Sequence, residues 1–276
     1  MIEIGKYNTL KAVRSMDQGF YLSSTEEKEV LLPNKYVPED FAIGDLLEVF
    51  VYKDSEDRIV ATTKEPYVMV GEFAYLKANA ITKFGAFLDW GLEKDLLVPF
   101  NEQINKMEEG RGYVIYAYLD EKTERIVATQ KYNKRLQPLP EDYNDNQEVE
   151  LLISKKTDLG FEAIIDDIAK GLIYNNEIFS NVKIGDRLDG FIKAIRPDGK
   201  IDLALQQSGK KHVDETSKII LNKLIDEGGH LPYHDKTDSE TIKKVFGISK
   251  KAFKKSIGAL YKKKMIQILE DGIKIN

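Results

Sequence analysis

The chain contains no cysteine. This absence excludes disulfides, iron–sulfur clusters, thiolate zinc sites and cysteine nucleophiles. Long apolar runs are also missing, since no segment approaches the roughly 18 consecutive apolar residues that a membrane-spanning helix requires. The first 13 residues lack the basic head and apolar run of a secretory signal. We therefore expect a cytoplasmic protein that does not interact with a membrane.

Residues suited to catalysis or metal binding are scarce. The chain has only three histidines, which are His212, His230 and His234. The last two are four residues apart, but a proline lies between them and no carboxylate pair is near, so the spacing does not indicate a metal site. The chain has neither a Gly-x-x-x-x-Gly-Lys-Ser/Thr phosphate loop nor a Gly-x-Ser-x-Gly motif. We expect no enzyme activity, no metal and no cofactor.

Positive charge is concentrated at the C-terminal end. The net charge is −5, but residues 209–276 carry 15 lysines, no arginine and 9 acidic residues, a balance of +6, and residues 1–208 carry −11. Seven of these lysines lie between Ser249 and Met265, where there is no acidic residue. They are either the solvated face of an amphipathic helix or an anion-binding surface, and we favour the second because uncompensated lysines repel one another. Lysine lacks the bidentate fork of arginine, which favours attraction to phosphate over recognition of bases.

Glycines recur at fixed spacing through the first three quarters of the chain. Each of Gly19, Gly85 and Gly160 is followed by Pro or Tyr after 14 residues and by a second glycine after 25. Around the first of them, β-type segments at 8–13, 19–23, 30–32, 46–52 and 58–62 alternate with turn-rich connections. Five strands in about 60 residues make one small barrel. We therefore predict three tandem five-stranded OB barrels, at residues 1–66, 67–136 and 143–208, with a proline-containing linker before the third.

The hydrophobic period changes after Gln207. Helical spacing predicts a helix over 216–225, a second that begins at Asp238 or Ser239 and ends at Phe246, and a third from 250 to about 264. A hairpin with an Asp-Gly turn closes the chain. This order predicts an α+β winged-helix domain at 212–276, attached to a mainly β chain.

The most informative stretch lies at residues 83–101, KFGAFLDWGLEKDLLVPFN. Phe84 and Phe87 are three residues apart, so they would face opposite sides of a regular strand. Gly85 between them allows the strand to bend, and the bend brings both rings to one surface. Exposed aromatic rings on a small OB barrel are a stacking platform for bases. Trp90, the only tryptophan, lies in the following loop, where we expect a structural role.

The stretch KFGAFLDWGLEKDLLVP resembles the S1 RNA-binding domain, with its aromatic-Gly-small-Phe strand and its later Gly-Asp and Arg-Ile-small-Leu segments. Three such units followed by a winged helix resemble the conserved virulence factor B family of bacterial RNA-binding regulators. The resemblance implies that stacking positions fall on Phe84, Phe87 and Phe161, and on Tyr174 at the histidine of the S1 pattern. It places the basic position before the last strand on Arg125 and Lys200.

The first unit departs most from this pattern. Phe20 and Tyr21 follow its glycine, Pro33 occupies the position of the S1 histidine, and no aromatic residue precedes Gly19. A structural role is as compatible with this unit as RNA binding.

The preferred interpretation is a cytoplasmic, non-enzymatic regulator that binds single-stranded RNA, because stacking needs unpaired bases. Phosphate attraction would come from the expected third helix, through Lys250, Lys251, Lys254, Lys255 and Lys262. Two alternatives stay open. One is a protein-interaction adaptor that uses the acidic barrels, and the other is a DNA-binding regulator that uses the winged helix alone.

Overall fold

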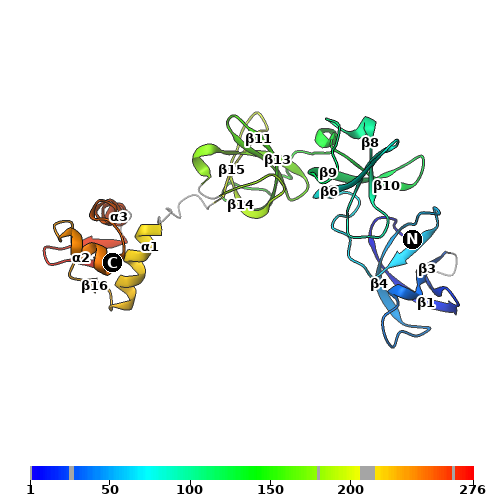
Figure 1. Ribbon diagram of the computed structural model, residues 1–276, viewed down its shortest axis with the longest axis horizontal. Helices are drawn as coiled ribbons and strands as arrows, with labels where there is room; N and C mark the ends of the chain where they lie inside the picture. The colour runs from blue at the N-terminus through cyan, green and yellow to red at the C-terminus, as the bar shows by residue number, and fades with distance from the viewer. Residues whose placement is uncertain (1, 25–27, 179–180, 206–214, 263–264) are drawn as a thin grey trace. The chain divides into compact units, whose positions relative to one another are not determined.

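The structure is a computed structural model, and it describes residues 2–24, 28–178, 181–205, 215–262 and 265–276. Contacts divide the chain into two units, Met1–Gln207 and Ser208–Asn276. The first unit contains three closed five-stranded barrels, and the second contains helices with a three-stranded sheet (Figure 1). The predicted fold class is confirmed.

The strands of the three barrels follow one plan. The first barrel consists of β1 (Tyr7–Met16), β2 (Gly19–Ser23), β3 (Glu29–Pro33), β4 (Leu46–Lys53) and β5 (Ile59–Thr62). The second consists of β6 (Phe73–Thr82), β7 (Gly85–Leu88), β8 (Leu96–Pro99), β9 (Gly112–Asp120) and β10 (Arg125–Thr129). The third consists of β11 (Glu148–Thr157), β12 (Gly160–Ile165), β13 (Ala169–Tyr174), β14 (Arg187–Ile195) and β15 (Ile201–Ala204).

Short 3-10 helices follow the third strand of each barrel. They are η1 (Asn34–Tyr36), η2 (Phe100–Glu102) and η4 (Asn175–Glu177), and a further one, η3 (Tyr132–Lys134), follows β10. Pro33 and Pro99 end the strands before η1 and η2, because proline has no N–H to continue the pairing.

The glycine spacing of the sequence is reproduced as strand register. Gly19 pairs with Pro33, Gly85 with Pro99 and Gly160 with Tyr174, so the second and third strands start their pairing at the same place in each barrel. The first strand of each barrel also has a bulge seven residues before this glycine, beginning at Ala12, Ala78 and Ile153. The repeat is therefore structural as well as sequential.

A side chain at the repeated glycine would collide with the neighbouring strand. A Cβ on Gly85 would lie 2.2 Å from the Val98 carbonyl oxygen, and the corresponding distances at Gly19 and Gly160 are 2.0 and 1.9 Å. The φ angles of these three glycines are +147° to +152°, a conformation that L-residues rarely adopt. Close approach of two backbones is the physical reason for the repeated glycine.

The first barrel has a core of its own, and a second cluster of buried side chains joins it to the second barrel. Phe50, Tyr52 and Val60 of the first barrel belong to the same cluster of buried side chains as Leu88 and Trp90 of the second. The third barrel has its own core, and a smaller cluster of Phe73, Val114, Leu152 and Ile164 joins it to the second. The proline-containing linker contacts the third barrel. The Gln137 N–H donates to the Ile168 carbonyl, and Leu139 packs on the core of the third barrel.

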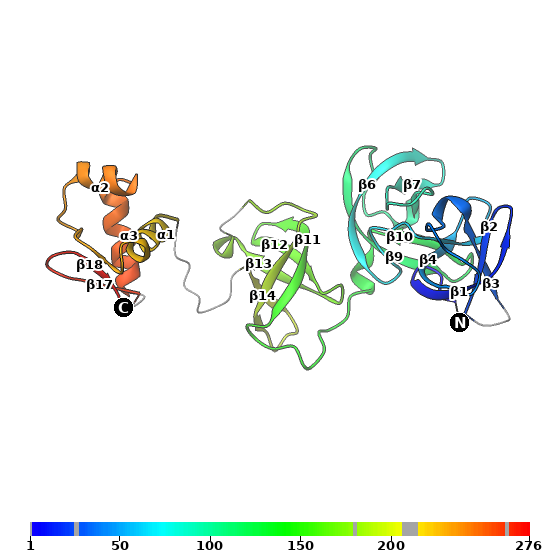
Figure 2. The same cartoon turned by 90° about the horizontal axis from the view of Figure 1, so that it is seen from below.

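The second unit has the predicted winged-helix order (Figure 2). Its elements are α1 (Glu215–Asp226), β16 (His230–Leu231), α2 (Ser239–Phe246), α3 (Lys250–Lys262), β17 (Ile266–Ile268) and β18 (Ile273–Ile275). The Asp238 carboxylate accepts from the Thr241 N–H at the start of α2, and the Ser249 hydroxyl accepts from the Ala252 N–H at the start of α3. The pairing of β16 with β18 was not predicted.

Candidate nucleic-acid interface

Each barrel has a surface depression at the same place in its fold. Counted from the repeated glycine, the residue before it and the second residue after it line the depression in all three barrels. These residues are Phe84 and Phe87 in the second barrel, Gln18 and Tyr21 in the first, and Leu159 and Glu162 in the third. The first residue of the pair is a ring only in the second barrel. The volumes are about 270 Å³ in the second barrel, 650 Å³ in the first and 590 Å³ in the third.

Phe84 and Phe87 line the same depression, as predicted. A bend of the strand at Gly85 does not by itself explain this, because Phe84 lies outside the strand. Phe84 occupies the two-residue turn between β6 and β7 and is 63% exposed, whereas Phe87 is half-buried within β7. A turn residue does not follow the alternation of strand faces, so both rings reach the depression. The Lys83 Nζ lies 5.1 Å from the Phe84 ring centroid, which adds a cation beside the platform.

Arg125 lines the same depression from the start of β10. Its guanidinium donates from Nε to Asp57 Oδ1 at 2.8 Å and from Nη2 to Asp57 Oδ2. Asp57 belongs to the β4–β5 hairpin of the first barrel, and the hydrogen bond from Arg125 holds the pKa of its carboxyl below the ordinary value. The charge of Arg125 is therefore balanced across the contact between the two barrels.

The depression of the third barrel brings together Tyr174 and Lys200. The Tyr174 hydroxyl accepts a hydrogen bond of 2.7 Å from Arg196 Nη2, and the same guanidinium forms an ion pair of 2.8 Å with Asp202. Lys200 is highly exposed and lies 2.9 Å from the Asp198 carboxylate. Arg196 was not predicted. It lies four residues before Lys200 on the same hairpin, and this position next to a predicted basic residue could have identified it.

Phe161 is not part of this depression. It lies one residue after Gly160, and strand alternation turns it away from the face that Glu162 shares. Its ring is half-buried and packs against the core of the third barrel, as Phe20 does in the first barrel. Ala86 is the corresponding core residue of the second barrel. The structure therefore separates Phe161 from Tyr174.

Tyr21 occupies a platform position in the first barrel, and its ring is covered. The Arg14 guanidinium carbon lies 3.6 Å from the Tyr21 ring centroid, and Arg14 also pairs with Glu29 at 2.8 Å. Stacking of a base on this face would require Arg14 to move.

The lysines of α3 divide into two sets. Lys251, Lys255 and Lys262 are exposed on the side opposite the buried Phe253, Ile257 and Leu260. Lys254 lies 3.5 Å from the Asp235 carboxylate, and Lys250 donates to the Lys236 carbonyl at 3.4 Å. Three lysines thus form an outward row, which we call the α3 lysine row. Lys263 and Lys264 lie outside the described residues.

Within the described ranges, no three residues among His, Asp and Glu are grouped so that they could hold a metal ion. No helix in that part of the chain is long and apolar enough to cross a membrane. His212 lies outside the described residues.

Two protein families match the chain. The S1 domain family matches residues 4–64, which form the first barrel, and the CvfB-like winged helix domain family matches residues 218–275. "Conserved virulence factor B" of Staphylococcus epidermidis is 24% identical over 275 residues, which are 96% of this chain and 92% of the relative. The predicted resemblance to the conserved virulence factor B family is confirmed. Both domain types are binding modules rather than enzymes.

Other relatives are similar over nearly the whole chain. "Uncharacterized protein YitL" of Bacillus subtilis is 28% identical over 273 residues, which cover 94% of this chain and 89% of the relative. A solved structure from Streptococcus pneumoniae, described as a multidomain protein with nucleic acid binding domains, is 22% identical, covers 99% of this chain and 98% of that chain, and has a TM-score of 0.45. The S1 match falls on the barrel that departs most from the predicted aromatic pattern.

Proposed function

We propose that this protein is a non-enzymatic, cytoplasmic regulator of gene expression that binds single-stranded RNA. One observation carries the proposal: the depressions of the second and third barrels each combine an aromatic ring with a basic residue beside the start of the barrel's last strand. The rings are Phe84 and Phe87 in the second barrel and Tyr174 in the third, and the cations beside them are Arg125 and Lys200. A flat ring with a neighbouring cation suits a base and its phosphate.

The strength of such a site follows from known contributions. Each stacked base contributes about 1–3 kcal/mol, and phosphate contacts add a term that decreases with salt. Single strands are favoured over duplexes because their bases can leave the stack and lie on a protein ring. The α3 lysine row would add to the attraction of phosphates. We keep the four predicted domains as the division of the chain into binding modules.

Fluorescence anisotropy of a labelled single-stranded RNA of about 15 nucleotides tests the proposal. We expect binding that weakens between about 50 mM and about 200 mM salt. Phe84→Ala/Phe87→Ala and Tyr174→Ala should each weaken it by about 5- to 150-fold per lost stack. Phe100→Ala is the matched control, because Phe100 is an exposed phenylalanine of the second barrel outside the depression.

A duplex DNA of the same length separates the alternatives. Preference for that duplex, with loss only after changes in the winged helix, would support a DNA-binding regulator. Absence of binding to either nucleic acid at low salt would overturn the proposal and favour the adaptor.

A further inference from the structure

The depression of the second barrel has a wall that comes from the first barrel. Tyr52 and Lys53 of β4 line it together with Phe84, Phe87, Trp90 and Lys94 of the second barrel. We call this cavity the seam pocket. With about 270 Å³ it is the smallest of the three barrel depressions described above.

Aromatic packing holds the wall in place. Trp90 meets Phe50 edge to face, with ring centroids 5.8 Å apart and planes at 79°, and meets Tyr52 in the same way at 6.3 Å and 82°. All three side chains are buried. Edge-to-face pairs of buried rings add to the stability of the contact beyond the burial of area. Tyr52 therefore has a fixed position beside the pocket.

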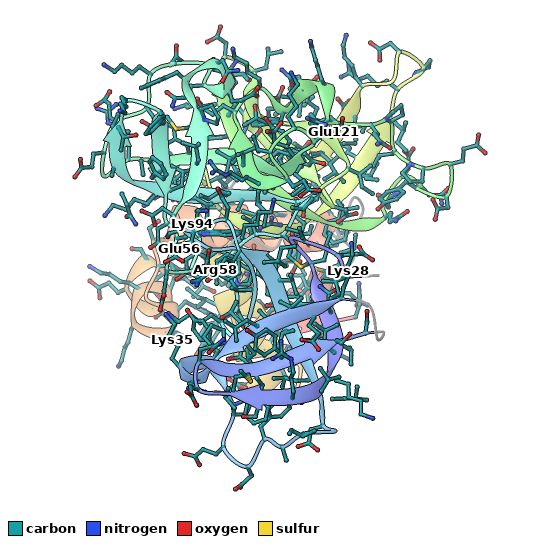
Figure 3. The ribbon with its side chains drawn as sticks, turned by 90° about the vertical axis from the view of Figure 1, so that its right-hand side faces the viewer. Lys28, Lys35, Glu56, Arg58, Lys94 and Glu121 are labelled. Carbon is teal, nitrogen blue, oxygen red and sulfur yellow. The ribbon has the colours of Figure 1, made fainter. Side chains whose placement is uncertain are left out.

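Polar contacts fix the hairpin that follows β4. Lys94 Nζ donates to the Asp54 carbonyl at 2.6 Å and to the Lys53 carbonyl at 3.3 Å. Lys53 forms an ion pair of 3.1 Å with Glu124, and Arg125 binds Asp57 as described above. Figure 3 shows Lys94 of the second barrel together with Glu56 and Arg58 of this hairpin. The first barrel is thus attached along one side of the pocket.

Lys94 also supplies the pocket with a polar group. It is partly buried, and burial lowers the pKa of its amine. An ammonium group has three N–H donors. The two carbonyls use two of them among the described contacts, which leaves one donor for an acceptor atom in the pocket.

We propose that the seam pocket holds a single nucleobase, with its ring against Phe84 and Phe87 and an acceptor atom of the base on Lys94. The first barrel, by this assignment, sets the size of the pocket. Pockets for drug-sized ligands occupy about 300–1000 Å³. At about 270 Å³ the seam pocket is smaller than these, which suits one ring system and not a run of stacked bases. This inference rests on the proposed function, since it specifies what one of its two faces binds. The base comes either from a strand or from a free nucleotide.

The only tryptophan of the chain reports on the pocket directly. Trp90 lines the seam pocket, so its emission changes when a base occupies the cavity. The intact chain is titrated with each of the four ribonucleoside monophosphates and with the strand of about 15 nucleotides used above. We expect a saturable change of Trp90 emission with the strand. A response to a monophosphate as well identifies the free nucleotide as a second source, and a response to the strand alone assigns the base to the strand.

Two pairs of variants locate the response. Phe87→Ala and Lys94→Met should each weaken it by roughly tenfold or more, because each loses a stack or a charged hydrogen bond. Phe100→Ala, an exposed phenylalanine outside the pocket, and Lys77→Met, an exposed lysine of β6, should leave it unchanged. Circular dichroism confirms that each variant is folded.

The outcomes separate this inference from the function on which it rests. RNA binding by anisotropy with constant Trp90 emission would overturn the seam pocket and leave RNA binding by the chain standing. A Trp90 response that persists in both Phe87→Ala and Lys94→Met would overturn it as well. Loss of both signals in the intact chain would overturn the two proposals together.

Discussion

The repeated glycine allows the second and third strands of each barrel to approach each other closely. Gly85→Ala should lower the free energy of unfolding by more than about 1–3 kcal/mol, because a strained φ is added to a Cβ placed 2.2 Å from the Val98 carbonyl oxygen. Gly110→Ala is the matched control: φ there is +80°, and a Cβ would have no described atom within 4 Å. We expect about 1–2 kcal/mol for the control. Equal losses in urea unfolding would show that the close approach of β7 and β8 is unimportant.

Asp167 gives the contact between the second and third barrels a dependence on pH. Its carboxylate accepts from the Phe73 N–H at 3.2 Å and lies 3.4 Å from Arg187. Burial raises its pKa above the ordinary 3.8, and Arg187 opposes the shift only in part. The protonated form is therefore favoured by folding, so this contribution to stability is complete below pH 3.8 and is lost as the pH rises through the raised pKa.

Asp167→Asn removes this titration and keeps an acceptor for Phe73. Relative to the intact chain, the variant should gain stability as the pH rises from about 4 to about 7. Urea unfolding followed by Trp90 emission at several pH values measures the difference. A difference that stays constant with pH, or that falls as the pH rises, would contradict the assigned sign.

Single residues also show where sequence reasoning succeeds and where it stops. The register of the glycines followed from spacing, because strand pairing preserves residue offsets. The S1 pattern places its rings one residue before and two residues after the glycine. Phe161 lies one residue after Gly160, and this offset turns it to the other face of the strand, so its prediction as a stacking residue did not follow the pattern. Phe84 lies in a turn of only two residues, and the limits of such turns are the least certain part of a strand assignment.

At the scale of one element, the α3 lysine row is expected to act through phosphates. Each phosphate contact on a single strand contributes about 0.7 to the slope of log K against log salt concentration. Lys255→Gln should lower the magnitude of the slope by about this amount. Lys254→Gln, one residue away, should lower it less, because Lys254 lies 3.5 Å from Asp235. A larger effect at Lys254 would show that the row on the outer face of α3 is not the phosphate-binding surface.

The helices and strands could be predicted more fully than their contacts. Capping by Asp238 and Ser249 and the helical period placed α2 and the start of α3, since these signals are local. β16 has two residues and no period of its own, so nothing in the sequence marked it. The interaction of Arg125 with Asp57 joins residues 68 positions apart, and such a pair depends on how two barrels dock. The position of Tyr52 in the wall of the seam pocket also depends on how the two barrels dock, so it could not be predicted from the sequence.

At the scale of the three-barrel unit, the cluster of buried side chains that the first and second barrels share predicts that these two barrels unfold together. Leu22→Ala removes a fully buried side chain from the first barrel's own core and should lower the free energy of unfolding by about 2–5 kcal/mol. Trp90 lies in the second barrel, yet its packing on Phe50 and Tyr52 couples it to the first. The urea midpoint followed by Trp90 emission should therefore shift in this variant. Leu151→Ala, equally buried in the third barrel, should shift that midpoint less, because the apolar cluster that joins the third barrel to the second is smaller than the one shared by the first and second. A Trp90 transition that does not respond to Leu22→Ala would mean that the two barrels unfold independently, and the first barrel could then not hold the wall of the seam pocket in place.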